Sequence, residues 1–322
     1  MIDSMEADKI KVSIIVLTYK RFDGIQKNIE SIMSQRFESY EIIISDDGSP
    51  NFDKQYIEAL LANAGNKRPY TVITRAENVG TVKNYNNAVK AAKGDIIVPL
   101  SQDDCFYSED SLSRIVEAFE DDETNIVLGL RCGVDQKKPL PGDYQREIIK
   151  ENNRKKLWFR NACRNMFYGA ALYIRKEYLS GKGFFDESYN LLEDYPFIMF
   201  AIEQGERIEV IDTPTVMYGV EGVSTGGFRI APERLVKDQI RLRTILCDKS
   251  CEKIHSRLGR RYLEYLLCMW KNANKRVFLQ RFRFPVINLV IWVTKLVATI
   301  KKEDVWDCRF KLLWRIETRA SR

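Results

Sequence analysis

Two adjacent carboxylates, Asp103 and Asp104, directly follow an apolar run in the segment 94–106. Open α/β sheets bind ligands at the carboxyl ends of their strands, so acids placed there are candidates for a site. Hard divalent cations such as Mg²⁺ or Mn²⁺ take oxygen ligands and usually share them with a substrate phosphate. We therefore expect a metal–phosphate site at Asp103 and Asp104. A solvated acidic turn is the alternative.

Two further acidic pairs follow the same logic. Asp46 and Asp47 end the apolar run 40–45, and Gly48 comes next. Glu193 and Asp194 open an apolar helical segment that ends at Gly205. The positive end of a helix dipole favours carboxylates in the first turn, so capping is an alternative role for that last pair.

Other common catalytic groups are scarce. The single histidine, His255, lies in a basic and helical-looking region, so Ser-His-Asp or Cys-His catalysis is improbable. Any acid–base chemistry then falls to carboxylates. The seven cysteines show neither metal-ligand spacing nor a disulfide framework, which predicts reduced thiols in a reducing compartment.

The elements that would position these acids alternate along the chain. Segments 11–17, 40–45, 70–74 and 96–100 have the continuous apolarity of buried parallel strands, and helical patterns lie between them. This alternation predicts an α/β fold with a mainly parallel sheet flanked by helices. Further strands are expected at 126–129, 167–174, 208–211 and 216–218. Residues 135–165 are expected to form a polar excursion with some helix.

Taken together, the motifs resemble family 2 glycosyltransferases, the inverting group with the GT-A fold. The resemblance covers roughly residues 11–227. Its motifs are Val12–Tyr19, Ile44–Ser49, Asn78–Gly80 with Asn86, Ala92–Ile97 leading into Leu100–Asp104, Gly183–Glu187 and Glu193-Asp194. It implies a Rossmann-like mixed sheet and a nucleotide-diphosphate-sugar donor, most often a UDP-sugar.

The resemblance also assigns roles on the donor side. Thr18, Tyr19, Asp46 and Asp47 would hold the uracil and ribose, and a carboxylate suits the N3–H of uracil. Lys83, one turn into the helix after Gly80, could offset diphosphate charge, although a lone lysine is more often simply exposed.

The metal motif departs from the family pattern. The family has Asp-x-Asp, whereas this chain has Ser101-Gln102-Asp103-Asp104. Ser101 and Asp103 are expected to contact the donor, and Asp103 and Asp104 to hold a divalent cation, Mn²⁺ or Mg²⁺. The pattern leaves open which aspartate is the main ligand. The late histidine of many family members has no counterpart in 218–224.

The third acidic pair, Glu193 and Asp194, is the candidate for the general base and the acceptor site. The resemblance implies that Asp194 is the single general base of an inverting displacement, and Glu193 and Gly169 are assigned to the acceptor site. A nearby carboxylate is sufficient to take the proton of an attacking hydroxyl.

The charge is asymmetric. The net charge is +6, but from Arg229 onward the chain has 23 Lys and Arg against 9 Asp and Glu. This predicts a catalytic domain at 1–228 and a basic helical region at 229–322. The apolar segment 285–300, with basic flanks and tryptophans, predicts a helix lying on an anionic membrane surface. Packing on the catalytic domain or on a second subunit is the alternative, and nucleic acid is not expected.

The resemblance implies a metal-dependent hexosyl- or N-acetylhexosaminyltransferase of surface polysaccharide synthesis. Its acceptor would be a glycan or a polyprenyl-linked glycan. We expect a cytoplasmic protein, peripheral on the inner face of the cell membrane, and a homo-oligomer is possible. The alternatives are an inactive sugar-nucleotide-binding scaffold subunit and, less favoured, a nucleotidyltransferase.

Overall fold

The structure is a computed structural model, and it describes residues 10–133, 138–219, 231–273 and 283–321. The chain forms two compact units. The first comprises Met1–Gly142, Phe167–Ile198 and Glu206–Gly222, and the second comprises Asp143–Met166, Met199–Gly205 and Val223–Arg322.

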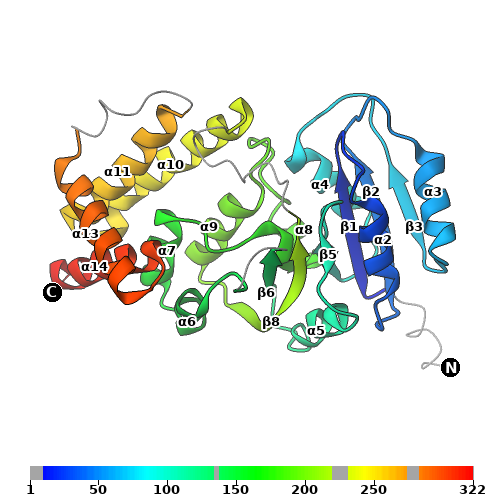
Figure 1. Cartoon of the computed structure of the whole chain (residues 1–322), viewed down its shortest axis with the longest axis horizontal. Coiled ribbons are helices and arrows are strands. Elements are labelled where there is room, and N and C mark those ends of the chain that lie inside the picture. The colour runs from blue at the N-terminus through cyan, green and yellow to red at the C-terminus, as the bar shows by residue number, and fades with distance from the viewer. Residues whose placement is uncertain (1–9, 134–137, 220–230, 274–282, 322) are drawn as a thin grey trace. The chain divides into compact units, whose positions relative to one another are not determined.

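The first unit is built on a mixed sheet with the strand order β3-β2-β1-β4-β7-β6-β8-β5 (Figure 1). Its strands are β1 (Val12–Thr18), β2 (Tyr40–Asp46), β3 (Tyr70–Ile73), β4 (Ile96–Pro99), β5 (Cys105–Phe106), β6 (Ile126–Gly133), β7 (Leu172–Arg175) and β8 (Ile208–Tyr218). The pairs β1–β2, β1–β4, β2–β3 and β6–β8 are parallel, and the other three are antiparallel. The predicted mainly parallel α/β sheet is confirmed.

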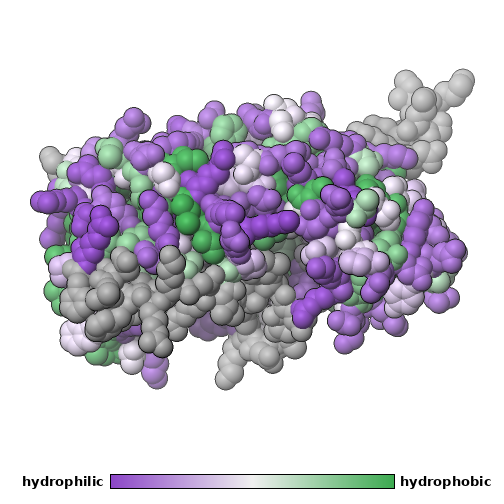
Figure 2. All heavy atoms as spheres, turned by 90° about the horizontal axis from the view of Figure 1, so that it is seen from above, coloured by the Kyte–Doolittle hydropathy of each residue, from purple (hydrophilic) through white to green (hydrophobic). Residues whose placement is uncertain are grey.

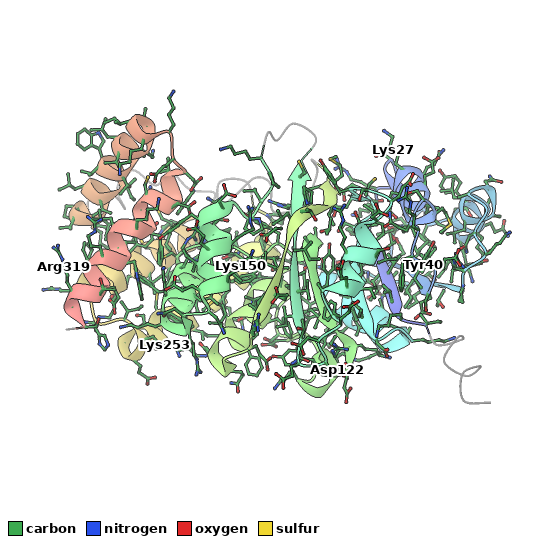
Figure 3. All side chains as sticks on the ribbon, turned by 90° about the horizontal axis from the view of Figure 1, so that it is seen from below. Lys27, Tyr40, Asp122, Lys150, Lys253 and Arg319 are labelled. Carbon is green, nitrogen blue, oxygen red and sulfur yellow. The ribbon has the colours of Figure 1, made fainter. Side chains whose placement is uncertain are left out.

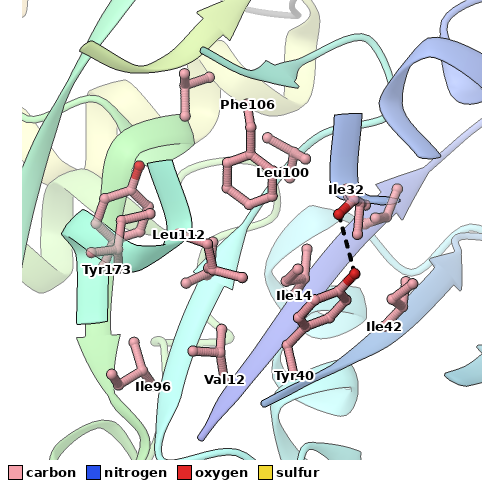
Figure 4. Close-up of a cluster of buried hydrophobic side chains, with 14 of the residues drawn as sticks. Val12, Ile14, Ile32, Tyr40, Ile42, Ile96, Leu100, Phe106, Leu112 and Tyr173 are labelled. Atoms are coloured by element: carbon pink, nitrogen blue, oxygen red, sulfur yellow. Dashed lines mark hydrogen bonds between the residues drawn. The ribbon is translucent and has the colours of Figure 1, made fainter. Parts of the chain in front are cut away.

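Helices cover both faces of the parallel part, as right-handed crossovers require. The helices of this unit are α2 (Ile25–Met33), α3 (Lys54–Asn63), α4 (Thr81–Ala91), α5 (Ser111–Glu117) and α8 (Lys176–Gly181), with the short 3₁₀ turn η1 (Gly169–Ala171). Alternate residues of β1, β2 and β4 form one core with α2, α3 and α5. Tyr40 anchors it by donating its hydroxyl to the carbonyl of Ile32 at 3.2 Å (Figure 4). Among the residues coloured in Figure 2, hydrophilic ones predominate and hydrophobic ones lie between them.

The second unit is helical. It contains α6 (Asp143–Glu151), α7 (Arg154–Cys163), the end of α9 (Asp194–Gln204), α10 (Glu233–Lys253), α11 (Arg257–Lys271), α13 (Pro285–Lys301) and α14 (Val305–Ala320). Its basic side chains include Lys150 on α6, Lys253 on α10 and Arg319 on α14 (Figure 3). The predicted helical, basic C-terminal region is confirmed.

The second unit also contains Asp143–Met166 and Met199–Gly205, which precede its predicted start at residue 229. Residues 157–163 of α7 are all buried, and α7 contacts α10, α11 and α14. The Arg160 guanidinium donates to the Asp307 carboxylate at 3.0 Å, and both side chains are largely buried. A buried ion pair needs an accurate mutual placement of its elements. A single boundary after residue 228 therefore does not describe this organisation.

Two local predictions differ from the structure. The expected strands 208–211 and 216–218 form one strand, β8. It pairs with β6 at both ends and at Pro214, and the register shifts near Leu130 accommodate the residues between. The expected strand 167–174 begins only at Leu172, because Gly169–Ala171 forms the 3₁₀ turn η1. The helix expected within the excursion 135–165 is confirmed by α6 and α7, and residues 134–137 lie outside the described residues.

Candidate active site

The carboxyl ends of β1 and β2 meet at Thr18 and Asp46, which are direct partners in the sheet. The Thr18 hydroxyl donates to Asp46 Oδ1 at 2.9 Å. The Ser49 amide donates to Asp46 Oδ2 at 2.7 Å, and the Ser49 hydroxyl donates to Oδ1 at 2.6 Å. Asp46 is fully buried. It therefore shapes the turn after β2 and ties that turn to the end of β1.

Asp47 holds the loop that leads into α4. It accepts hydrogen bonds from the Asn78 side-chain amide at 2.7 Å and from the backbone amides of Val79 and Gly80 at 2.9 and 3.0 Å. Burial raises the pKa of Asp47, and the two backbone bonds oppose that rise. Gly48 has φ +74°, and a Cβ there would lie 2.5 Å from the Glu77 carbonyl carbon. Only glycine fits this close approach of the two loops.

Asp103 and Asp104 lie in the turn between β4 and β5, as the sequence predicts. Asn28 on α2 fixes this turn, because its side-chain amide donates to the carbonyls of Ser101 at 2.9 Å and Asp104 at 2.8 Å. The Gly219 amide donates to Asp104 Oδ1 at 2.8 Å. Burial, with the neighbouring charge of Asp103, raises the pKa of Asp104 to about 7.

The donor set of this turn fits a hard divalent cation. Asp104 Oδ2 is buried and has no hydrogen-bond partner among the residues that the structure describes, and the same holds for Gln102 Oε1. Such unsatisfied oxygens are costly unless a ligand occupies them. Two carboxylates are few for a dedicated metal cage, and no group of three or more His, Cys, Asp or Glu side chains suited to a metal occurs in the described ranges. The arrangement suits a cation that completes its shell with substrate oxygens.

The third acidic pair lies at the start of α9. The Gly169 amide donates to Asp194 Oδ2 at 3.1 Å. A Cβ on Gly169 would lie 3.2 Å from Glu193 Oε1 and 3.5 Å from Asp194 Oδ2. Gly169 thus lies against both carboxylates, which brings together the three residues that the sequence assigns to the base and the acceptor side.

Backbone contacts join the nucleotide-side loop to the base segment. The Val82 amide donates to the Asn190 carbonyl at 3.1 Å, and a Cβ on Gly80 would lie 2.8 Å from the same oxygen. Because Gly80 also donates to Asp47, Asp47 and the segment before Glu193 are positioned by the same loop.

A second connection runs through Arg131, which the sequence reasoning missed. Its guanidinium lies between the rings of Tyr168 and Tyr218, 4.0 and 4.1 Å from their centroids. Tyr218 precedes the Gly219 that binds Asp104, and Tyr168 precedes the Gly169 that binds Asp194. Arg131 Nε has no hydrogen-bond partner among the described residues. The positive charge of Arg131 lowers the pKa of Asp104, but burial raises that pKa by more.

The sequence feature that could have identified Arg131 as a site residue is its position near the end of a strand. The expected strand 126–129 continues as β6 to Gly133, which puts Arg131 near the carboxyl end where β1, β2 and β4 also deliver polar residues. The rings that hold it come from segments distant in sequence, so only the folded chain shows the stacking.

Three other residues predicted to bind the donor are more exposed than Asp46 and Asp47. Tyr19 is partly exposed and lies within cation–π distance of Lys20, with the ammonium 4.9 Å from the ring centroid. Lys83 is exposed on the first turn of α4, and Ser101 is half-buried. A cavity of about 510 Å³ is lined by Lys20–Asp23 and Ser49–Asn51. None of the acidic pairs lines this cavity, so we do not assign the reacting sugar to it.

Residues 13–179 match the glycosyl transferase family 2, and this span contains the Asp46-Asp47 and Asp103-Asp104 pairs. The chain belongs to glycosyl transferase family 2. The predicted family is thus confirmed. Asp194 lies outside the matched span, so its assignment rests on the resemblance of its motif and on its contact with Gly169.

Curated relatives of this family 2 chain carry glycosyltransferase names. It is 28% identical over 215 residues to the uncharacterized glycosyltransferase EpsJ of Bacillus subtilis, covering 64% of this chain and 60% of EpsJ. It spans only 30% of an uncharacterized glycosyltransferase of Rickettsia felis. It is 22% identical over 289 residues to the GalNAc(5)-diNAcBac-PP-undecaprenol beta-1,3-glucosyltransferase of Campylobacter jejuni, covering 83% of this chain and 89% of that protein.

Solved structures show the same fold. TarS residues 1–349 of S. aureus in complex with UDP-GlcNAc superposes with a TM-score of 0.57 at 20% identity, covering 90% of this chain and 77% of TarS 1–349. The mannosyltransferase PcManGT of Pyrobaculum calidifontis, in complex with GDP-Man and Mn²⁺, gives 0.58 at 16% identity, covering 97% and 87%. The GT-A fold of this family 2 chain is therefore confirmed.

Proposed function

We propose that this protein is an inverting glycosyltransferase that moves a hexosyl or N-acetylhexosaminyl group from a UDP-sugar. The observation that carries the proposal is the family 2 match over the residues that hold the nucleotide-side and metal-side acids. The UDP-GlcNAc complex of TarS supports a uridine donor. The placement of Asp46, Asp47 and Thr18 at one sheet edge supports a nucleotide site there.

In this proposal Asp103 and Asp104 would hold Mn²⁺ or Mg²⁺ at the donor diphosphate. The unsatisfied Asp104 Oδ2 supports this role. When bound, the cation would offset negative charge on the diphosphate. Ser101 replaces a family carboxylate, so the turn carries one negative charge fewer. Arg131, fixed between two rings, adds a positive charge close to Asp104.

Asp194 acts as the general base. Its carboxylate takes the proton of the acceptor hydroxyl while that oxygen attacks the anomeric carbon, and the bond to the diphosphate breaks on the opposite face. The hydrogen bond from the Gly169 amide to Asp194 Oδ2 helps to hold the carboxylate in one orientation. Glu193 and Gly169 border the acceptor in this arrangement.

We place the acceptor among glycans carried on a polyprenyl diphosphate, in surface polysaccharide synthesis at the inner membrane face. The name of the C. jejuni relative, which matches most of both chains, supports the polyprenyl-linked acceptor. All seven cysteines are free thiols, which suits a reducing compartment.

A donor screen tests the proposal. The full chain is incubated with a panel of nucleotide sugars, Mn²⁺ and a polyprenyl-linked glycan, and release of nucleotide diphosphate is measured. We expect turnover of a UDP-sugar that EDTA abolishes and that Asp103→Asn or Asp104→Asn lowers by at least ~100-fold. Donor binding by calorimetry without turnover on any acceptor would instead support the inactive scaffold subunit. Turnover that EDTA leaves unchanged would refute the metal site.

A further inference from the structure

One face of α13 anchors that helix within the second unit. Ile287, Val290, Thr294 and Ala298 are buried on it, and α13 contacts α11 and α14. The Thr294 hydroxyl donates to the Val290 carbonyl at 2.7 Å, so the polar group on this face is satisfied within the helix. The buried face alone packs α13 against its neighbours, so the other faces of the helix are not required to hold it in place.

A second apolar face of the same helix is exposed. Six of the twelve exposed large hydrophobic side chains of the described residues lie on α13. They are Val286 at 59%, Leu289 at 59%, Trp292 at 63%, Val293 at 36%, Leu296 at 49% and Ile300 at 72% exposure. At about 100° per residue these positions fall on one side of the helix, away from the buried face. A continuous exposed apolar stripe of this kind marks an interaction surface.

The charged residues from Arg283 to Lys302, on α13 and at its two ends, are all positive. Arg283 lies before it, Lys301 and Lys302 lie after it, and Lys295 borders it, each exposed. No Asp or Glu occurs between Glu264 and Glu303. Glu303 itself is paired with Lys311 at 2.8 Å. A cavity of about 360 Å³, lined in part by Trp292 and Lys295, opens beside the stripe.

We propose that α13 docks on an anionic lipid bilayer, lying in the interface with the stripe Val286–Ile300 in the acyl boundary and its basic residues among the headgroups. An exposed tryptophan and flanking lysines suit that depth. The helix has 17 residues. No helix in the described part of the chain is long and apolar enough to cross a membrane.

A second copy of the chain fits this face less well. In a two-fold contact the same surface meets itself, so the basic rim of one helix would face the basic rim of the other. α13 has no acid to neutralise that repulsion. Anionic lipid supplies the missing negative charge.

The test is co-sedimentation of the full chain with vesicles of phosphatidylcholine with and without phosphatidylglycerol. We expect binding to the anionic vesicles that weakens by ~tenfold or more when phosphatidylglycerol is omitted. The double variant Leu289→Ser with Leu296→Ser should lose ~tenfold or more of the binding, because two exposed apolar side chains are removed. Ile245→Ser, at an exposed apolar position of α10, is the matched control and should bind as the unmodified chain does.

Two further readouts distinguish membrane docking from self-association of the chain. Brominated lipid should quench tryptophan fluorescence in the unmodified chain, and Trp292→Phe should remove most of that quenching. Lys295→Gln with Lys301→Gln should lower binding to the anionic vesicles by ~tenfold. Circular dichroism melts check that each variant is folded.

Three outcomes would overturn the proposal. The first is that the full chain does not bind anionic vesicles, and the second is that the double serine variant binds unchanged. The third is a dimer in light scattering that the double serine variant dissociates, with no vesicle binding. The test uses no sugar donor, so its result is independent of the proposed transferase activity.

Discussion

At the scale of single residues, the acidic pairs differ in role: some carboxylates hold loops in place, and others are available for binding or chemistry. Asp46 and Asp47 each accept three hydrogen bonds that hold the turns after β1 and β2 and before α4. Asp104 keeps one buried oxygen without a hydrogen-bond partner among the described residues. Substitutions at Asp46 and Asp47 would therefore disturb the loops and the donor site together. Substitutions at Asp194 give a cleaner test.

Asp194→Asn is expected to lower kcat by ~1,000-fold while leaving the Kd for the nucleotide-sugar donor within about twofold, because an amide cannot take the acceptor proton. Steady-state kinetics and donor titration measure the two effects. Glu193→Gln is the matched variant, since it removes the neighbouring charge and should lower kcat much less. The reverse ranking of the two variants would make Glu193 the base.

Arg131→Lys is expected to lower kcat by ~30-fold or more, although it keeps the positive charge. Lysine lacks the planar group that stacks between Tyr168 and Tyr218, so its charge is no longer fixed beside Asp104. The measurement is kcat and KM for the donor, with a melting curve to check folding. Arg36→Lys, at an exposed ion pair with Glu109 and Asp110, is the control. Equal kinetics for both variants would remove Arg131 from the site.

At the scale of elements, one carboxylate ties three segments of the second unit together. Glu317 on α14 is fully buried. It accepts the backbone amides of His255 and Ser256, each at 2.8 Å, and the Lys155 ammonium of α7 at 2.9 Å. Burial alone would raise the pKa of Glu317, but these hydrogen bonds outweigh it and lower the pKa to about 2. The link between α10 and α11 is thus fixed to α14 and α7.

Glu317→Gln should lower the free energy of unfolding at neutral pH by up to about 3 kcal/mol. The folded-state pKa lies below the ordinary 4.5. The contribution is therefore complete above about pH 4.5 and is lost as the pH falls toward 2. The difference between the unmodified chain and the variant should shrink over the same range.

Urea unfolding followed by tryptophan fluorescence at several pH values measures this difference. The matched control is Glu303→Gln, which removes an exposed ion pair with Lys311 and should change the free energy of unfolding little at any of these pH values. A constant difference between Glu317→Gln and the unmodified chain across the pH range would contradict the ionic origin of the effect.

At the scale of the whole molecule, the two units are interleaved in sequence. The second unit takes Asp143–Met166 and Met199–Gly205 from within the span of the first, besides Val223–Arg322. The buried side chains of α7, including Leu157 and Phe159, need the C-terminal helices as their packing partners. The basic region is therefore not a detachable tail.

A chain truncated to residues 1–228 should be soluble only in part and should bind the dye ANS more strongly than the full chain, because it exposes the apolar side chains of α7. Its unfolding should also be less cooperative. Size-exclusion chromatography and ANS fluorescence measure these properties. A monomeric truncated chain with a sharp melting transition would show that 1–228 is an independent domain after all.

The sequence by itself determined the order of strands and helices in the parallel half, because continuous β-branched runs and helical periodicity are local properties. It also determined where the acids would emerge, since the carboxyl ends of parallel strands share one edge. The Asp46, Asp103 and Asp194 positions follow from that rule and from the family motifs. It did not reveal that Asp46 and Asp47 each accept three hydrogen bonds, because most of the donors lie on other segments of the chain.

Only the tertiary structure decided the rest. The stacking of Arg131 depends on two tyrosines from distant segments, and the packing of α7 depends on helices near the other end of the chain. The sequence showed that 285–300 is apolar with basic flanks, but apolarity alone does not tell which face is buried. Contacts with α11 and α14 cover one face of α13 and leave the other open. Burial is a property of the neighbours that folding supplies, so no pattern within the segment could have settled it.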